Sequence, residues 1–515
     1  RYGKPCIQKD SFNELVPKIK AADCVVFDLP LLFWTISSKL KAFVERFYCI
    51  AEEDSNPPLG RYEKYPVKDS ALLMTEGNIA KQIIYFSVPL ILGNLLQQLY
   101  NTADSIIVGN FVGSNALAAV GSSTSLIHLL IAFSMGASVG TGVIVSQYLG
   151  AEEHEKVHSA VHTALAIAVI LGLILTAAGI VLAAPILHWM NTPDDVFADS
   201  TSYMQIYFGG ILFGVVYNMA SGILNAVGNS KRSLLYLGCA SIINIILDLI
   251  FVGLLDMGVA GAALATDISQ LVSSVLALAY LMRVKAEYRV ELKQIKVDKR
   301  MAGRIIKVGL PTGIQNMVIS FSNVLVQSSV NRFGSAAMAG YGAYLKVDGF
   351  NILPVSSFSM ALTTFTGQNF GAGKLDRVKR GISITLLMGI VYTIITGVLL
   401  LVFGDQIMRL FANDASVIAY GKLAMRYFCP FYALLSVMHG LAGAIRGTGK
   451  TVQPMAVFLI SLCVFRIIWL QFVLPFFSTI DGIYMIYPIS WALGMVLMIL
   501  YAWKGKWLER SSTAL

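Results

Sequence analysis

Long apolar runs dominate this sequence from about residue 82 onward, and each is long enough to cross a lipid bilayer as a helix. Because the bilayer core offers the backbone no water, a spanning segment must satisfy its own hydrogen bonds. Only 13% of the 515 residues are charged, whereas soluble domains carry about 25%. The runs therefore predict an all-α polytopic membrane protein with twelve transmembrane helices. The predicted spans are 82–108, 120–148, 159–187, 203–226, 232–254, 259–282, 304–331, 338–369, 380–403, 417–443, 453–476 and 482–502.

The sequence repeats itself at an interval of about 221 residues. The stretch 147-QYLGA-151 corresponds to 368-QNFGA-372, and 87-SVP-89 corresponds to 309-GLP-311. Each repeat holds six predicted spans, and because six is even, both repeats enter the membrane in the same direction. Parallel repeats of this kind typically enclose a substrate path that opens alternately to the two sides. We therefore expect two parallel six-helix bundles.

The repeats also divide the chain. We expect an N-lobe over 76–282 and a C-lobe over 304–508, joined by an inter-lobe loop over 283–303. Residues 1–75 have a soluble composition, and their strand-like and amphipathic stretches indicate a small α/β fragment. The six cysteines show no C-x-x-C spacing, so they indicate neither a disulfide framework nor a metal site.

Basic residues gather in the connections that follow even-numbered spans. The stretch 283–307 holds nine Lys and Arg residues against three acids, and 374-KLDRVKR-380 is also basic. The opposite connections are acidic or neutral, as in 191-NTPDDVFADS-200. By the positive-inside rule, both termini face the cytoplasm. Contact with anionic lipid explains the basic stretch sufficiently, so we expect no nucleic-acid partner.

Two aspartates lie inside predicted spans of the first repeat, where a carboxylate costs about 2.5–3.5 kcal/mol. Asp248 follows Asn244 by four residues, so both lie on one helix face, and Asp104 lies late in the first span. The second repeat has Val326 and Leu470 at the corresponding positions. The acids therefore belong to one half of the chain alone.

Two interpretations of these acids stay open. They could form a polar contact between helices, or they could bind a cation or proton, which we favour because intramembrane acids are functional by default. Two facing carboxylates in low dielectric cannot both ionise cheaply, so the pair could take up and release a proton. A sodium ion could instead be held by carboxylate, amide and hydroxyl oxygens.

From about residue 78 to 508, the chain resembles the multidrug and toxic compound extrusion (MATE) family. In one prokaryotic branch of that family, a first-helix proline precedes an aspartate by fifteen residues, and the fifth helix carries N-x-x-x-D. A sixth-helix threonine follows that motif's aspartate by eighteen residues. The matching residues here are Pro89, Asp104, Asn244, Asp248 and Thr266. Asn218, in 217-YNMASGIL-224, resembles a fourth-helix asparagine of the same site.

The resemblance implies a secondary active multidrug efflux antiporter and not an enzyme. Such a protein exports amphipathic, often cationic, organic compounds in exchange for H⁺ or Na⁺ by alternating access. The resemblance implies an N-lobe cation site at Asp104, Asn244, Asp248, Thr266 and Asn218, with Pro89 as the hinge. It also implies a monomer in the bacterial plasma membrane, without a cofactor or metal beyond the coupling ion. The stretch 311–327 lacks the acid of the sodium-driven branch, which argues against a second site in the C-lobe.

We expect aromatic and methionine side chains such as Phe350, Met360 and Tyr341 to line the substrate cavity. The other charged residues of the C-lobe spans are Lys346, Asp348, Arg446 and Arg466. We expect structural roles for all four. Arg446 lies near a span end, so we expect its side chain to extend toward the headgroups.

The stretch 24-CVVFDLPLLFWTISSKLKAFVERF-47 resembles the flavin-contacting region of flavodoxin-like NAD(P)H-dependent FMN reductases. The phosphate-binding turn of that family does not precede it, so we expect residues 1–75 to be a partial flavodoxin-like fragment that does not bind FMN. Two alternatives to the antiporter stay open. One is a lipid-linked precursor flippase, which would favour a strongly cationic cavity, and the other is a membrane-tethered flavin reductase completed by a partner.

Two further motif matches are interpreted as structural. The stretch 154-HEKVH-158 fits the H-E-x-x-H zinc pattern, but it corresponds to the connector 375-LDRVK-379 of the second repeat, so we expect no zinc site. The stretch 447-GTGKT-451 resembles the end of a phosphate-binding loop. It follows a predicted membrane helix and not a strand, so we expect a simple turn there.

Overall fold

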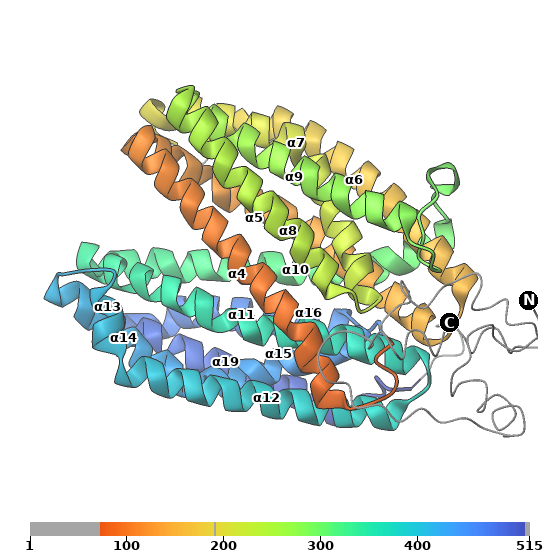
Figure 1. Ribbon diagram of the computed structural model, residues 1–515. Helices are drawn as coiled ribbons and strands as arrows, with labels where there is room; N and C mark the ends of the chain where they lie inside the picture. The colour runs from red at the N-terminus through yellow and green to blue at the C-terminus, as the bar shows by residue number, and fades with distance from the viewer. Residues whose placement is uncertain (1–72, 190–191, 510–515) are drawn as a thin grey trace, which may run out of the picture. The chain divides into compact units, whose positions relative to one another are not determined.

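The computed structural model describes residues 73–189 and 192–509, which form helices joined by short connections and contain no β-strand (Figure 1). The predicted flavodoxin-like fragment lies outside the described residues, except for its last three positions.

The first half contains six helical segments of membrane length, and each includes one predicted span. Asn78 starts the first segment, because its side chain accepts a hydrogen bond from the Lys81 N–H. The segments are α4 (Ile79–Phe111), α5 (Ser114–Gly150), α6 (His154–Trp189), α7 (Asp194–Ala226), α8 (Ser230–Asp248) with the π-helical η3 (Leu249–Leu254), and α9 (Gly258–Arg283).

The second half repeats this pattern after the connection 284–298, which contains the short 3₁₀-helix η4 (Leu292–Gln294). Its first long helices are α10 (Lys299–Val330), α11 (Ser335–Gly371) and α12 (Leu375–Val402). The short η5 (Asn331–Phe333) lies between α10 and α11, and the short α13 (Gly404–Arg409) follows α12. The remaining segments are α14 (Ala415–Phe428), η6 (Cys429–Phe431), α15 (Tyr432–Gly447), α16 (Val452–Phe458), η7 (Leu459–Val464), α17 (Phe465–Ile468), η8 (Trp469–Val473), η9 (Leu474–Phe476), α18 (Asp481–Tyr484) and α19 (Ile486–Lys504).

Within the described ranges, nine helical segments are long and apolar enough to cross a membrane, judged by length and composition alone. The three other long helices are α5, α10 and α11, with 37, 32 and 37 residues. They pack against one another between the two halves, so much of their surface faces protein instead of lipid and can carry Gly, Ser and Thr. With these three, the structure confirms the predicted twelve transmembrane helices.

The two halves form separate bundles, an N-lobe of α4–α9 and a C-lobe of α10–α19 (Figure 1). The first helix of each lobe packs against its own lobe and also against the other. Helix α4 contacts α8 and α11, and helix α10 contacts η7 and α5. Because α8 and the α16–η9 segment occupy the same place in the two repeats, the structure shows the predicted internal symmetry.

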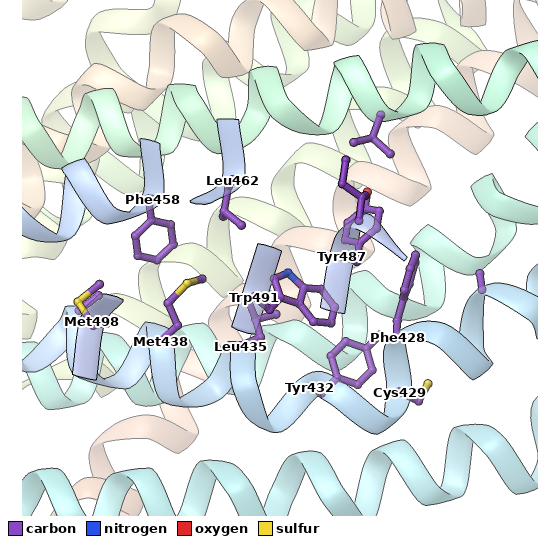
Figure 2. Packing of buried hydrophobic residues seen from close by; sticks show 14 of the residues in the cluster. Phe428, Cys429, Tyr432, Leu435, Met438, Phe458, Leu462, Tyr487, Trp491 and Met498 are labelled. Atoms are coloured by element: carbon purple, nitrogen blue, oxygen red, sulfur yellow. The ribbon is translucent and has the colours of Figure 1, made fainter. Parts of the chain in front are cut away.

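The C-lobe has a dense aromatic core between α14, α15 and α19. The ring of Phe428 lies 4.4 Å from that of Tyr487, and the ring of Tyr432 lies 5.7 Å from that of Trp491 (Figure 2). Aromatic pairs at these distances add stabilisation beyond the area that they bury. This core packs α14, α15 and α19 together within the C-lobe.

At one end of the bundles, which we call the basic end, the two lobes are held together. It comprises the connections 151–153, 227–229, 284–298, 372–374 and 448–451. Gln147 of α5 donates a hydrogen bond to the Gly447 carbonyl at 2.8 Å, and Gln368 of α11 donates one to the Ala226 carbonyl at 2.9 Å. Both pairs are related by the 221-residue repeat, so the two lobes exchange equivalent hydrogen bonds.

Two glycines let α5 and α11 meet closely at this end. A Cβ atom on Gly150 would lie 1.9 Å from the Gln368 carbonyl oxygen, and one on Gly371 would lie 2.0 Å from that of Gln147. Neither position can carry a side chain while the basic end is closed. The segment before α4 joins the same contact, because the buried Met74 donates its N–H to the Gln368 side chain at 2.7 Å.

Two histidines of α6, His154 of the H-E-x-x-H stretch and His162, hold the inter-lobe connection against this helix. His154 pairs with Glu287 at 2.6 Å, and the neighbouring His162 accepts the Glu291 N–H at 2.9 Å. These contacts give the histidines a structural role at the basic end.

The glycine contact leads to a test of the closed basic end. Gly150→Ala should drive α5 and α11 apart there, because its methyl group has no room beside Gln368. Spin labels at positions 155 and 376, in a variant without native cysteines, should then report longer distances by pulsed electron resonance. Gly303→Ala is the matched control, since a Cβ there meets no atom within 4 Å. An unchanged distance in Gly150→Ala would contradict the close packing of α5 against α11 at the basic end.

Candidate functional site

A cavity of about 930 Å³ lies between the two lobes. Helices α4, α5, α7, α8 and α9 line it on the N-lobe side, and α10, α11 and α15 line it on the C-lobe side. Most of its polar lining consists of amides and hydroxyls. Among the described lining residues, the charged ones are Asp104 from the N-lobe, and Lys346 and Arg446 from the C-lobe.

Five of the six residues predicted for the site contribute to this lining. They are Pro89, Asp104, Asn218, Asn244 and Thr266. The sixth, Asp248, is fully buried one helical turn from Asn244.

The structure brings the two acids together with Asn244 and Thr266. Asp104 and Asp248 are close enough to interact electrostatically, although they lie on different helices. The Asn244 amide donates to the Thr266 hydroxyl at 3.5 Å, and that hydroxyl donates to the Ala262 carbonyl at 3.1 Å. Side chains from α4, α8 and α9 therefore meet at one place on the N-lobe wall.

This cluster contains acceptor oxygens that nothing in the described structure satisfies. Both oxygens of Asp248, one oxygen of Asp104 and the Asn244 side-chain carbonyl are buried and accept no hydrogen bond there. An unpaired buried carboxylate is costly unless a proton or cation compensates it. The oxygens therefore have the chemistry of a site for H⁺ or Na⁺.

The backbone of the fifth span changes at this site. Helix α8 ends as an α-helix at Asp248, and six residues of π-helix follow, from Leu249 to Leu254. Single turns of π-helix occur often at functional sites, because they shift the direction of nearby side chains. The equivalent C-lobe segment also contains π-helix, in η7 and η8, so the irregularity is part of the repeat.

Asn218 lies apart from the acids. Its side-chain amide donates to the Ser134 hydroxyl of α5 at 3.4 Å, and its backbone carbonyl accepts a hydrogen bond from the Ser138 hydroxyl at 2.6 Å. Tyr203 interacts electrostatically with both acids and lies fifteen residues earlier in α7, which corresponds to about 22 Å. The structure therefore places Asn218 in the same cavity as Asp104, Asn244 and Thr266, with hydrogen bonds to α5 and none to the acids in the described residues, and its part in the ion site stays a prediction.

Pro89 lies inside α4, which continues without a break from Ile79 to Phe111. A proline has no N–H to donate to the carbonyl four residues earlier, so the helix is weakened at this point. Ser230, at the start of α8, donates to the nearby Phe86 carbonyl at 3.1 Å. The position suits a hinge, and the hinge role stays a prediction.

Comparison with known proteins decides the family. The family model described as MatE matches residues 89–250 and 311–470, one match in each lobe. The probable multidrug resistance protein YpnP of Bacillus subtilis (strain 168) is 31% identical over 393 residues, which cover 76% of this chain and 88% of that protein. The chain belongs to the MATE family.

Other MATE proteins agree with this assignment. The probable multidrug resistance protein YoeA of the same organism is 27% identical over 445 residues, which cover 84% of this chain and 96% of that protein. A solved structure described as the outward-facing conformation of a multidrug resistance MATE family transporter has a TM-score of 0.79. It is 21% identical and covers 86% of this chain and 99% of its own, so that likeness shows the fold. The MATE chain is thus a multi-pass multidrug efflux transporter and not an enzyme.

The C-lobe of this MATE protein has no equivalent cluster of unsatisfied acids in the described residues. Asp348 accepts hydrogen bonds from Tyr344 at 3.4 Å and from Tyr432. Arg466, which replaces Asn244 in the repeat, donates to Ser322 and Ser490 at 3.2 Å each. Its guanidinium also lies 4.4 Å from the Tyr487 ring centroid. These contacts fit the structural roles predicted for Asp348 and Arg466.

Two of the three side chains predicted to line the cavity do so. Phe350 and Met360 belong to its C-lobe wall. The prediction for Tyr341 is wrong, because this residue is 1% exposed and its hydroxyl is hydrogen-bonded to that of Tyr487 at 2.5 Å. It faces the aromatic core and not the cavity.

Tyr203 and Asp267 are two buried side chains near the predicted site residues that the sequence predictions do not include. Asp267 follows Thr266 directly, is 8% exposed, and has one oxygen without a hydrogen-bond partner among the described residues. Its position next to a predicted site residue was a usable signal. Tyr203 gave no such signal, because only the packing of α7 brings it near the acids.

The Asp267 side chain of α9 packs directly against Gly210 of α7. This contact between α7 and α9 can be tested. A Cβ on Gly210 would lie 2.1 Å from the Asp267 Cγ, whereas one on Gly209 would meet nothing within 4 Å. Gly210→Ala should therefore destabilise the N-lobe by about 1–3 kcal/mol, and Gly209→Ala should not. The melting temperature of the purified protein in detergent measures both. Equal melting temperatures for the two variants would contradict the observed α7–α9 packing.

Proposed function

We propose that this protein is a secondary active antiporter that exports amphipathic, often cationic, organic compounds in exchange for H⁺ or Na⁺. The coupling ion binds at the N-lobe cluster of Asp104, Asn244, Asp248 and Thr266. The observation that carries the proposal is the group of buried acceptor oxygens in this cluster that have no donor in the described structure. A proton or sodium ion satisfies them, and a cationic substrate competes through Asp104, which lines the cavity.

Coupling needs only that ion and substrate favour different states of the transporter. When the ion neutralises the acids, the hydrogen bonding around Asp104 changes, and α4 bends at Pro89. The bend alters the cavity wall on which Asp104 lies and releases the substrate. When the ion leaves, the charged acids again attract a cation from the cavity.

The proposal also assigns an orientation. By the positive-inside rule, the basic end faces the cytoplasm of a bacterial cell and both termini lie on that side. The conformation with its basic end closed then keeps the cavity from the cytoplasm. One copy contains a complete cluster and a complete cavity, which supports a monomer as the functional unit.

Replacing the acids tests the proposal directly. Asp104→Asn and Asp248→Asn should each reduce ion-driven efflux of a fluorescent organic cation to the background rate, because the amide keeps the shape but cannot bind the ion by charge. The assay uses purified protein in vesicles with an imposed pH or Na⁺ gradient. The gradient that drives efflux in the unmodified protein also identifies the coupling ion.

Asp256→Asn is the matched control. Asp256 is exposed beyond η3 and has φ of 51°, a conformation that asparagine also tolerates. It should retain full transport. Gradient-driven efflux that survives in Asp104→Asn or Asp248→Asn at normal protein levels would refute the assigned role.

A further inference from the structure

We propose that Lys346 binds an acidic group of the transported compound, so that the preferred substrates are zwitterionic amphipaths. The basic group of such a compound lies toward Asp104 on the N-lobe wall, and its carboxylate, sulfonate or phosphate lies toward Lys346 on the C-lobe wall. The inference deepens the proposed function and rests on this cavity being the transport path.

The charges of the cavity are divided between the lobes. Asp104 is the carboxylate among the described lining residues, and both fixed cations, Lys346 and Arg446, belong to the C-lobe. A substrate with only a positive charge is attracted by one wall and repelled by the other. A compound with charges of both signs is attracted by both walls.

Lys346 has no counter-ion of its own. It takes part in no ion pair or side-chain hydrogen bond within the described residues. The nearest acid in the sequence is Asp348, but residues two apart do not face each other on a helix. Asp348 is instead turned into the C-lobe, where Tyr344 and Tyr432 donate hydrogen bonds to it.

The depth of Lys346 in the cavity matches that of Asp104. Asn94 of α4 donates to Ser357 of α11 at 3.2 Å, which aligns the two antiparallel helices. Asp104 lies ten residues beyond Asn94, and Lys346 lies eleven residues before Ser357. Both are therefore about 15–17 Å from this hydrogen bond, toward the end opposite to the basic end. No ion pair joins them in the described structure, and both line the same cavity, so a ligand bound there can contact both.

The surroundings of Lys346 suit the apolar part of an amphipath. Phe350 follows it by four residues and lies on the same face of α11. Phe350 and Met360 are 41% and 38% exposed, and both line the cavity. Aromatic and thioether surface beside a few placed charges is the usual lining of a site for small organic molecules.

Lys346 is exposed to the cavity, so water solvates its ammonium group until an anionic group of a ligand takes the place of that water. The anionic group could also belong to a lipid headgroup. We commit to a small zwitterion, because the charge of opposite sign at the same depth on the other wall fits a compound that spans the cavity.

The test uses a fluorescent xanthene dye with a free carboxylate and the methyl ester of the same dye, which is a pure cation. We expect the purified protein to bind the carboxylate dye more tightly, because only this dye contacts Lys346. Lys346→Gln should weaken binding of the carboxylate dye about tenfold, the effect of one charged hydrogen bond, and leave the ester unchanged. Lys346→Arg should restore the preference, and Lys379→Gln, at an exposed lysine of α12, should behave as the unmodified protein.

Transport in vesicles separates this inference from the proposed function. If the ester is still exported through Asp104 but Lys346→Gln affects both dyes equally, the inference fails and the antiporter stands. If neither dye moves under any gradient, the proposed function fails and the inference with it. If Lys346→Gln slows the movement of a labelled anionic lipid and changes neither dye, the occupant is a headgroup and the zwitterion is refuted.

Discussion

The bilayer core contains no water, and this constraint explains both the scaffold and the site. Backbone groups without water must pair within helices, so the described chain is helical throughout its membrane-length segments. Charged side chains without water need a partner, a cavity or a bound ion. Asp348 and Arg466 have hydrogen-bond partners inside the C-lobe. Asp104 and Asp248 lack partners for their buried oxygens, which is why they are the candidates for ion binding.

The protein combines a symmetric scaffold with asymmetric chemistry. The exchange of hydrogen bonds by Gln147 and Gln368 follows the internal repeat, and so does the π-helix of the fifth and eleventh spans. The side chains at the centre do not follow it, because Asn244 corresponds to Arg466, which donates hydrogen bonds to two serines of the C-lobe. One lobe therefore carries the proposed ion site, while the other carries the cationic side chains that line the cavity.

Alternating access in this architecture requires the basic end to open. The contacts that hold the closed state include two side-chain hydrogen bonds and the close approach of α5 and α11 at Gly150 and Gly371. Each of these hydrogen bonds contributes only about 1 kcal/mol net. A modest difference in ligand affinity between two states suffices to shift such an equilibrium.

The sequence alone determined the twelve spans, the parallel repeat and the residues Asp104, Asn244, Asp248 and Thr266, because apolar runs, spacing and charge depend on local order along the chain. It also pointed to Phe350 and Met360. Only the tertiary structure decided which residues share a site, since that depends on how separate helices cross. The packing of α7 brought Tyr203 near the acids and joined Asn218 to α5 through hydrogen bonds. Helix α11 is oriented so that Tyr341 lies in the C-lobe core and Lys346 lines the cavity.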